Sequence, residues 1–347
     1  MVGRAGLRPF LILAALVAPL LAVPAPLERG QARAQAAAPA QAGNPEAMEL
    51  ARQAVVKVRA FVSGEARSAR TLGTEREGSG VVIDADGLIV TIGYVILEAM
   101  GVEITDHRGR TIRADIVGYD ADTGFGLLRA TEPLPVRPAP MGRAGRLAAG
   151  ERVTIVAAGE GGAQPALMVQ RREFAGYWEY MLDEAVFVSP PHARWAGAGL
   201  FTGEGRLVAI GSLLVGQVAP GVPVPGNMMI PIDLLRPILG DLLALGRMST
   251  PSRPWLGVNV QEAPRGVIVT RVQAESPAER AGLKQGDIII GLAGEPVRDI
   301  PDFYRKLWSK GEAGVTVGLE LYGAGGGRSL TVTSGDRRRY MKSGQSY

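Results

Sequence analysis

The chain has 347 residues, of which 46% are hydrophobic and 21% are charged, and its formal net charge is +4 at pH 7. A chain of this length and composition is globular and long enough for two domains. Its small net charge gives no indication of nucleic-acid binding. The sequence contains no Cys and two His, which excludes disulfides, a thiol nucleophile and a cluster with zinc-ligand spacing. We therefore expect no metal site and no cofactor.

The N-terminus has the parts of a secretory signal. Arg residues precede an apolar run at residues 10–23, and small-residue cleavage motifs end at Ala34 and Ala36. The run is short for a bilayer span, and Pro19 interrupts it. We predict a signal peptide over residues 1–36, an exported, periplasmic protein and no stable membrane span after cleavage. The alternative is a signal that is kept as a membrane anchor.

After a small-residue linker at 37–48, residues 49–247 are rich in short β-type segments separated by turn signals. This spacing favours an all-β barrel or sandwich over parallel βαβ units. A helical period covers 232–247, with Asp233 as the predicted N-cap, Pro237 near the first turn and Gly246 near the C-terminal end. Strands are expected at residues 54–62, 80–84, 88–92, 102–105, 112–118, 126–130, 152–158, 167–174, 185–188 and 207–215.

A second, smaller unit is predicted at 255–335, after a linker at 248–254. Its pattern is that of a mixed α+β module, and the basic tail at 336–347 has no apolar pattern and is expected to be frayed. Helices are expected at 276–282 and 300–310, and strands at 255–261, 266–273, 287–294, 315–322 and 329–333.

Two stretches, GSGVVIDADGLIVTIGYVI at 78–96 and SPAERAGLKQGDIIIGLAGEPVRD at 276–299, carry a resemblance. The first resembles the glycine turn, hairpin and histidine strand of the HtrA/Deg family, exported trypsin-like serine proteases with a C-terminal PDZ domain. The second resembles the centre of the family's PDZ domain. Residues 117–130 are similar to its aspartate segment, and residues 200–212 to the strand pair after its serine. The resemblance implies a mainly β fold, with a trypsin-like double β-barrel followed by a small α+β PDZ domain.

The resemblance also gives three triad positions, Tyr94, Gly124 and Ala196. Where the family has Thr-Asn-x-His-Val this chain has TIGYV, so Tyr94 replaces the histidine. Where the family has Thr-Asp-x-Ala-Leu-Leu this chain has TGFGLL, so Gly124 replaces the aspartate. Where the family has Gly-Asn-Ser-Gly-Gly-Pro-Leu this chain has RWAGAGL, so Ala196 replaces the serine. Arg194 takes the place of a glycine of the oxyanion hole.

These replacements predict a degenerate catalytic triad, that is, a pseudoprotease. Acyl transfer by a hydroxyl needs an oxygen nucleophile, a base and a group that fixes the base. Ala196 has no oxygen, Tyr94 is a poor base at neutral pH, and Gly124 has no side chain. We assign no catalytic residue.

Other polar residues near these positions leave alternatives open. His192, four residues before Ala196, is either a loop histidine or part of a rewired site, in which Ser189 or Ser212 would need a base within reach. Tyr94 either fills the space of a lost cleft or has a relocated role. Trp195 either plugs the cleft or contacts a ligand.

Asp120 and Asp122 flank the vacant aspartate position. A turn role, in which an Asp side chain bonds the nearby backbone, is the preferred interpretation over catalysis.

The second unit holds the predicted binding site. WLGV resembles the family's carboxylate-binding loop, in which backbone N–H groups hold a peptide C-terminus while the peptide adds to a strand. Phe303 and Leu307, at i and i+4, either line the apolar pocket or belong to the core. The peptide-binding residues predicted from the resemblance are Trp255, Leu256, Gly257, Val258, Asn259, Val260, Phe303 and Leu307.

The sequence thus predicts a catalytically inactive HtrA-like protein that binds peptide C-termini or unfolded segments in the cell envelope. One alternative is an active serine endopeptidase of envelope quality control, which would need a serine hydroxyl within reach of His192 or His107. Another is a regulatory subunit that assembles with an active homologue, and a homo-oligomer is a further expectation. No nucleic-acid partner is expected.

Overall fold

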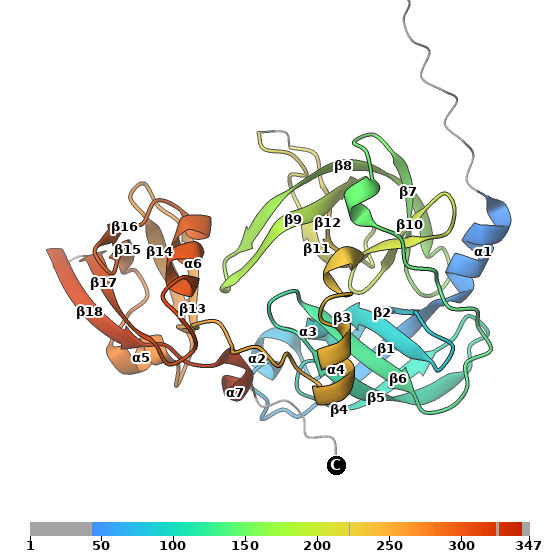
Figure 1. The fold of residues 1–347 in the computed structure, drawn as a ribbon, viewed down its shortest axis with the longest axis horizontal. Coiled ribbons are helices and arrows are strands. Elements are labelled where there is room, and N and C mark those ends of the chain that lie inside the picture. Colours follow the sequence, from blue (N-terminus) through green and yellow to red (C-terminus); the bar gives the residue numbers. More distant parts are fainter. Residues whose placement is uncertain (1–43, 222, 324–325, 342–347) are drawn as a thin grey trace, which may run out of the picture. The chain divides into compact units, whose positions relative to one another are not determined.

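The computed structural model describes residues 44–341, apart from 222 and 324–325. Over these residues the fold is mainly β: two closed barrels and a smaller sheet with helices (Figure 1), which confirms the predicted fold class. The predicted signal peptide and most of the linker at 37–48 lie outside the described residues. In the described part of the chain, none of the helices has the length and apolar character needed to cross a bilayer.

The first barrel has the strand order β1-β2-β3-β6-β5-β4, with neighbouring strands antiparallel. In β1 every second side chain from Val56 onward points into the barrel, which is the period-2 pattern of a strand with one buried face. β3 is buried at all of its positions because it lies between β2 and β6. The strands of this first barrel are β1 (Val55–Val62), β2 (Glu75–Val82), β3 (Leu88–Ile92), β4 (Ala99–Thr105), β5 (Thr111–Tyr119) and β6 (Phe125–Ala130).

The second barrel has the order β10-β11-β12-β9-β8-β7. β8 and β9 form a long hairpin whose turn, residues 177–179, lies far from the barrel's other turns (Figure 1). β12 was not predicted, and β10 was expected only as the first half of the strand pair at 200–212. The strands are β7 (Arg152–Val156), β8 (Ala163–Gly176), β9 (Tyr180–Ser189), β10 (Gly199–Thr202), β11 (Leu207–Val215) and β12 (Gly226–Pro231).

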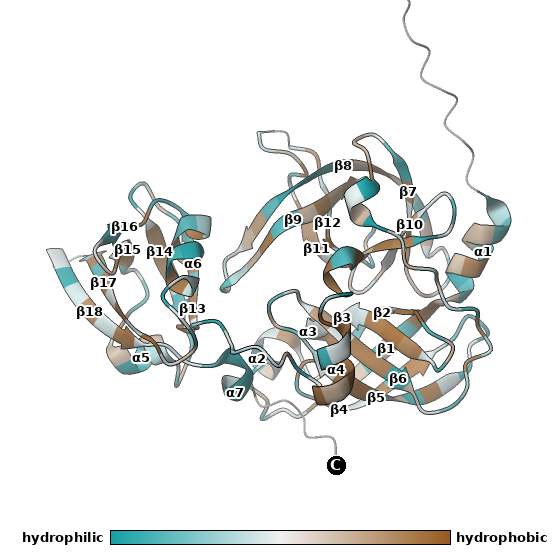
Figure 2. Ribbon diagram, viewed as in Figure 1, coloured by the Kyte–Doolittle hydropathy of each residue, from teal (hydrophilic) through white to brown (hydrophobic). Residues whose placement is uncertain are grey.

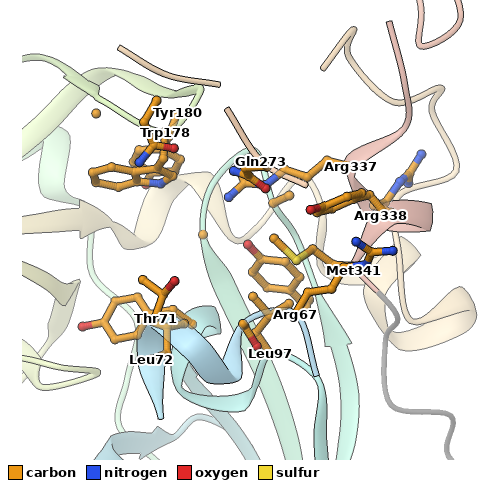
Figure 3. Close-up of a pocket in the computed structure, with 18 of the residues that line it drawn as sticks. Arg67, Thr71, Leu72, Leu97, Trp178, Tyr180, Gln273, Arg337, Arg338 and Met341 are labelled. Carbon is orange, nitrogen blue, oxygen red and sulfur yellow. The ribbon is translucent and has the colours of Figure 1, made fainter. Parts of the chain in front are cut away.

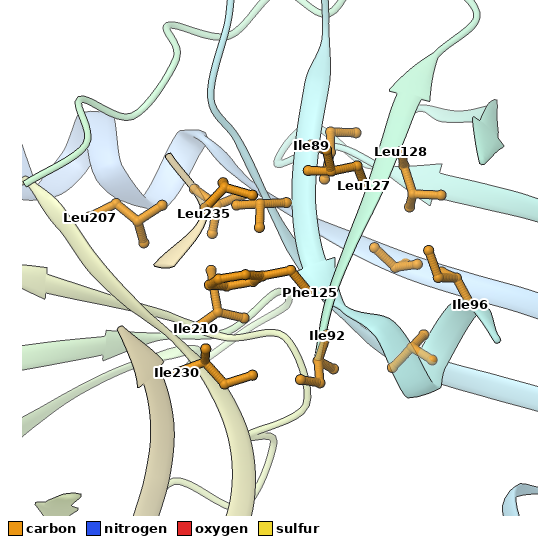
Figure 4. Close-up of a cluster of buried hydrophobic side chains, with 14 of the residues drawn as sticks. Ile89, Ile92, Ile96, Phe125, Leu127, Leu128, Leu207, Ile210, Ile230 and Leu235 are labelled. Carbon is orange, nitrogen blue, oxygen red and sulfur yellow. The ribbon is translucent and has the colours of Figure 1, made fainter. Parts of the chain in front are cut away.

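The two barrels share one hydrophobic core cluster. Phe125, the first residue of β6, is fully buried, and Figure 4 shows its ring beside Ile210 and Ile230 of the second barrel. The segment just before Phe125 carries Gly124, so the same packing fixes one of the triad positions.

The C-terminal sheet has the order β13-β14-β15-β17-β18, with β16 paired to β15. Both predicted helices are present, each with a Pro in its first turn and a capping side chain, from Ser276 in α5 and Asp299 in α6. The elements are β13 (Val258–Glu262), β14 (Val267–Val272), α5 (Pro277–Ala281), β15 (Ile288–Leu292), β16 (Glu295–Pro296), α6 (Ile300–Trp308), β17 (Thr316–Gly323) and β18 (Gly326–Thr333).

The helical segments of the barrel region differ from the sequence prediction. A first helix begins at Pro45, inside the predicted linker, because the side chain of Asn44 accepts from the N–H groups of Glu46 and Ala47. The helix predicted over 232–247 is split. The helices are α1 (Pro45–Gln53), α2 (Ala69–Leu72), α3 (Gly93–Ile96), η1 (Ala144–Arg146), η2 (Ile232–Leu234) and α4 (Leu239–Leu245).

Asp233 is not an N-cap, contrary to the prediction. Its carboxylate accepts a 2.6 Å hydrogen bond from the N–H of Ala144, 89 residues away in the chain. α4 starts only after Pro237, which has no N–H to donate and cannot lie in a helix interior. Gly246 does end the helix, in the left-handed conformation expected of a C-terminal cap.

The expectation of a frayed tail is wrong for its first residues. α7 (Arg337–Tyr340) is capped by the side chain of Asp336, and Figure 2 shows this helix as hydrophilic. The Tyr340 ring packs 4.5 Å from that of Trp255, and its hydroxyl donates to the carbonyl of Ala274. A local pattern cannot show this anchoring, since it comes from residues more than 60 positions away in the chain.

In α6 a buried carboxylate, Asp302, is held by cations on both sides along the helix. It accepts from the backbone N–H and guanidinium of Arg298 and, at 2.6 Å, from the ammonium of Lys306. The hydrogen bond from Arg298 is the largest of the effects that hold the pKa of Asp302 well below its usual range, against the opposing effect of burial.

We expect Asp302→Asn to lower the stability of the C-terminal unit at pH 7 by about 1–2 kcal/mol, because the charge-assisted hydrogen bonds are lost. Because the folded pKa lies below the unfolded value, this stabilisation is present above about pH 4 and disappears as the pH falls towards the folded pKa. Urea unfolding of the wild type and of Asp302→Asn between pH 7 and pH 2 should therefore show a difference in unfolding free energy that becomes smaller as the pH falls. Asp115→Asn, at an exposed site on β5, is the control, and an equal gap there would contradict the prediction.

Candidate functional site

Tyr94 lies in α3, directly after β3, and its hydroxyl is already engaged. The hydroxyl donates a 2.9 Å hydrogen bond to the carbonyl of Ser212 on β11. Burial raises the pKa of Tyr94 far above its usual value, and a hydrogen bond with Trp195 only partly opposes this effect. The phenol is therefore neutral at physiological pH and has no capacity to take a proton from a nucleophile.

Gly124 lies beside the same short helix, since its carbonyl accepts a 2.7 Å hydrogen bond from the N–H of Gly93. Its φ is +86°, a conformation that favours glycine. A Cβ placed there would lie 3.2 Å from Ile230 Cδ1 and 3.3 Å from the hydroxyl of Tyr180. The backbone at this position is thus shaped for the absence of a side chain.

Ala196 is held against the first barrel by its backbone. Its carbonyl accepts a 2.8 Å hydrogen bond from the N–H of Ser79, and the next N–H, of Gly197, donates to the carbonyl of Gly211. The hydroxyl of Ser79 accepts from the N–H of Ala158. The methyl group of Ala196 offers no nucleophilic oxygen.

The backbone N–H of Arg194 donates a 3.0 Å hydrogen bond to Nδ1 of His192, two residues earlier in the chain. The N–H of His192 in turn donates to Asn227 Oδ1, so the imidazole belongs to a buried backbone network. Burial is the main cause that lowers the pKa of His192, with a contribution from the charge of Arg194. His192 is consequently a loop histidine whose Nδ1 already accepts a hydrogen bond, and the backbone donor beside it has a partner.

Four of the other candidates also have structural partners. The hydroxyl of Ser189 donates to the carbonyl of Pro225, and His107, in an exposed turn, contacts its neighbour Arg108. Asp120 accepts from both the N–H and the hydroxyl of Thr123, which is the turn role favoured from the sequence. Asp122 forms an ion pair with Arg253.

The backbone loop at residues 256–258 has the shape of a carboxylate site. Gly257 has φ +84°, and three successive N–H groups, those of Leu256, Gly257 and Val258, point at one carboxylate. That carboxylate is the side chain of Glu179, from the β8–β9 hairpin, at distances of 2.9, 2.7 and 2.9 Å. Sequence reasoning did not single out Glu179.

The two helix residues predicted to line a pocket, Phe303 and Leu307, are both fully buried in the core of the C-terminal unit. Trp255 is also buried, whereas Asn259 is partly exposed on β13. The peptide-binding role of these residues stays a prediction.

A cleft of about 2550 Å³ is lined by residues of both the barrel region and the C-terminal unit. Tyr94, Gly124 and Trp195 line it on the barrel side, and Asn259 and Val260 line it on β13. Figure 3 shows its mixed walls, with aromatic rings from β9 and its turn facing aliphatic and cationic side chains. The labelled residues there are Arg67, Thr71, Leu72, Leu97, Trp178, Tyr180, Gln273, Arg337, Arg338 and Met341.

Two protein families match separate parts of this chain. The trypsin-like peptidase domain family matches residues 78–210, and the PDZ domain family matches residues 254–333. Over these two ranges the chain is therefore similar to trypsin-like peptidase domains and to PDZ domains.

Relatives named as DegP-like and HtrA proteases match most of this chain. A probable periplasmic serine endoprotease DegP-like of Rhizobium meliloti is 27% identical over 277 residues, which cover 71% of this chain and 53% of the relative. The serine protease Do-like HtrA of Lactobacillus helveticus is 26% identical, with 72% of this chain and 66% of the relative covered. The chain thus spans about half to two thirds of the length of these relatives.

The solved structure of the HtrA-type protease AlgW with a decapeptide has the same fold. It matches with a TM-score of 0.51 and 18% identity, and the match covers 84% of this chain and 98% of that chain. In this HtrA/DegP-like chain the structure brings Tyr94, Trp195 and Ser212 together and places Gly93 against Gly124.

Proposed function

We propose that this HtrA/DegP-like chain is a non-catalytic protein that binds peptide C-termini or unfolded segments in the cell envelope. The proposal rests mainly on one observation: the segment around Ala196 has no hydroxyl, and the nearby N–H of Arg194 is bonded to His192. A hydrolase of this type needs a nucleophile and free donors for the oxyanion, and losing a triad serine or histidine lowers turnover on the order of a millionfold.

The binding half of the proposal is supported by the loop at 256–258. Its three N–H groups are arranged to hold a carboxylate, which is the group that a peptide C-terminus presents to a PDZ domain. The relative AlgW has been solved with a decapeptide. The predicted signal at residues 1–36 and the relatives' description as periplasmic support a periplasmic location.

An active serine endopeptidase is the second candidate. It is favoured by the names of the relatives, which are described as serine endoproteases or proteases. It would need a hydroxyl activated by a base, and the hydroxyls of Ser189 and Ser79 and the ring of His192 each have other partners.

The two candidates are separated by assaying the purified protein and an Ala196→Ser variant with fluorescein-labelled casein and a fluorophosphonate probe. We expect the wild type to bind casein by anisotropy but to show neither turnover nor labelling. We expect the variant to remain inactive as well, since the Tyr94 hydroxyl already donates a hydrogen bond to the carbonyl of Ser212 and is no base. Trypsin is the positive control. Labelling of the wild type would overturn the proposal, and mapping the labelled residue would identify the nucleophile.

A further inference from the structure

The carboxylate loop of the PDZ domain is occupied by another part of the same chain. Glu179 lies in the turn of the β8–β9 hairpin of the second barrel, and its carboxylate accepts from all three N–H groups of the loop. These are the contacts that the terminal carboxylate of a bound peptide would make. No free carboxylate can enter the loop while Glu179 is there.

The backbone of the hairpin turn also takes the place of a ligand strand. The N–H of Val260 on β13 donates a 2.9 Å hydrogen bond to the carbonyl of Tyr177. On the opposite side, the hydroxyl of Tyr304 on α6 donates to the carbonyl of Gly176 and accepts from the N–H of Glu179. The turn is therefore bonded both to the strand and to the helix of the PDZ domain.

The contact is specific and conformationally demanding. Glu179 has φ +56°, which is uncommon for a residue other than glycine, and only 6% of its surface is exposed. Burial raises the pKa of its carboxyl, and the three backbone hydrogen bonds oppose that effect. A residue is held in this way only where its surroundings determine it, and here the surroundings are the three N–H groups of the loop at residues 256–258.

The flanks of the turn reinforce it. Ala175 and Met181 pack against the core of the PDZ domain, and Glu173 forms an ion pair with Arg305 on α6. On its other face the turn carries Trp178, whose ring stacks on Tyr180 at 5.6 Å. The hydroxyl of Tyr180 donates to the carbonyl of Thr123, next to Gly124. Displacing the turn would therefore also disturb the barrel side of the cleft.

We propose that Glu179 is an internal ligand of the PDZ carboxylate loop, and that a peptide with a free C-terminus binds only by displacing the turn at residues 177–179. The proposal rests on the function proposed above, since it assumes that the loop takes peptide carboxylates. It adds that binding is suppressed in the isolated chain and that occupation of the loop releases the hairpin turn from β13.

The test uses the full mature chain and a fluorescein-labelled decapeptide that ends in Val, together with the same peptide as its C-terminal amide. Wild type, Glu179→Gln and Tyr304→Phe are compared by anisotropy. Glu184→Gln, an exposed change of the same type on β9, is the matched control. Hydrogen exchange of the amides of residues 256–260 is followed in parallel, and protection of β15 shows that each variant is folded.

Removal of the internal ligand should raise the fraction of open loop and lower the apparent Kd for the free-acid peptide about tenfold or more. Tyr304→Phe should act in the same direction, and Glu184→Gln and the amide peptide should show no gain. If wild type and Glu179→Gln bound the free-acid peptide with equal, measurable affinity, Glu179 would not be an internal ligand. The proposed peptide-binding function would remain. Faster exchange at 256–258 in Glu179→Gln without any peptide binding would overturn the proposed peptide function, and Glu179 would then be a structural contact only.

Discussion

Replacing Phe125 by Ala is expected to lower the free energy of unfolding of the barrel domain by about 3–5 kcal/mol. The ring is fully buried between the two barrels, in contact with the cluster that includes Ile92, Ile210 and Ile230 (Figure 4). Truncation removes its apolar burial and leaves a cavity that two rigid barrels cannot close. Urea unfolding followed by tryptophan fluorescence measures the loss.

The control is Leu243→Ala on α4, where the side chain is 44% exposed. A change at such a position is expected to alter stability by no more than about 0.5 kcal/mol. If both variants lost the same amount, the barrel interface would not be the tightly packed core that Phe125 indicates. Gly124, which directly precedes Phe125, would then lack the fixed position on which the argument about the triad depends.

Most strands were predictable because their patterns are local. β1 alternates between buried and exposed positions, and β3 is a short apolar run between turn signals, so each carries its own evidence in sequence. β12 does not. It begins with Gly226 and Asn227 and ends at Pro231, which are residues typical of turns, and it is a strand because β11 and β9 pair with it on either side.

Long-range contacts explain what the sequence could not show at the site. Glu179 stands in a hairpin turn, where an acidic residue is unremarkable, and its partners lie 77–79 residues further along the chain. Only the path of the β8–β9 hairpin brings it to the loop at 256–258. Asp233 failed as a predicted cap for the same reason, because a distant N–H at Ala144 competes for its carboxylate.

The three predicted triad positions come from sequence motifs, which preserve order and spacing, and they stay a prediction. The replacements at Tyr94, Gly124 and Ala196 can be read directly from the aligned motifs, whereas their consequences need the structure. The phenol bonded to Ser212, the left-handed backbone of Gly124 and the donor of Arg194 taken by His192 are geometric facts. Together they argue that restoring one side chain would not restore chemistry.

The segment around Ala196 is itself expected to be sensitive to a single methyl group. Gly197 has φ +72°, and a Cβ there would lie 1.9 Å from the carbonyl oxygen of Ser79 and 2.7 Å from Thr91 Oγ1. The hydroxyl of Thr91 donates to the same carbonyl, so this oxygen is fixed from the other side. We expect Gly197→Ala to cost about 3 kcal/mol or more in unfolding free energy, measured by urea unfolding.

Gly101→Ala in β4 is the matched control, because its Cβ would meet nothing within 4 Å and its φ is ordinary. That variant should be neutral or slightly more stable, by up to about 1 kcal/mol. A harmless Gly197→Ala would mean that the segment moves freely away from Ser79. The N–H of Arg194 would then be free to leave His192, and the strongest structural argument against hydrolysis at Ala196 would be lost. A large loss confined to Gly197 would instead show that the backbone at this site is fixed in the arrangement that leaves no oxyanion donor at Arg194.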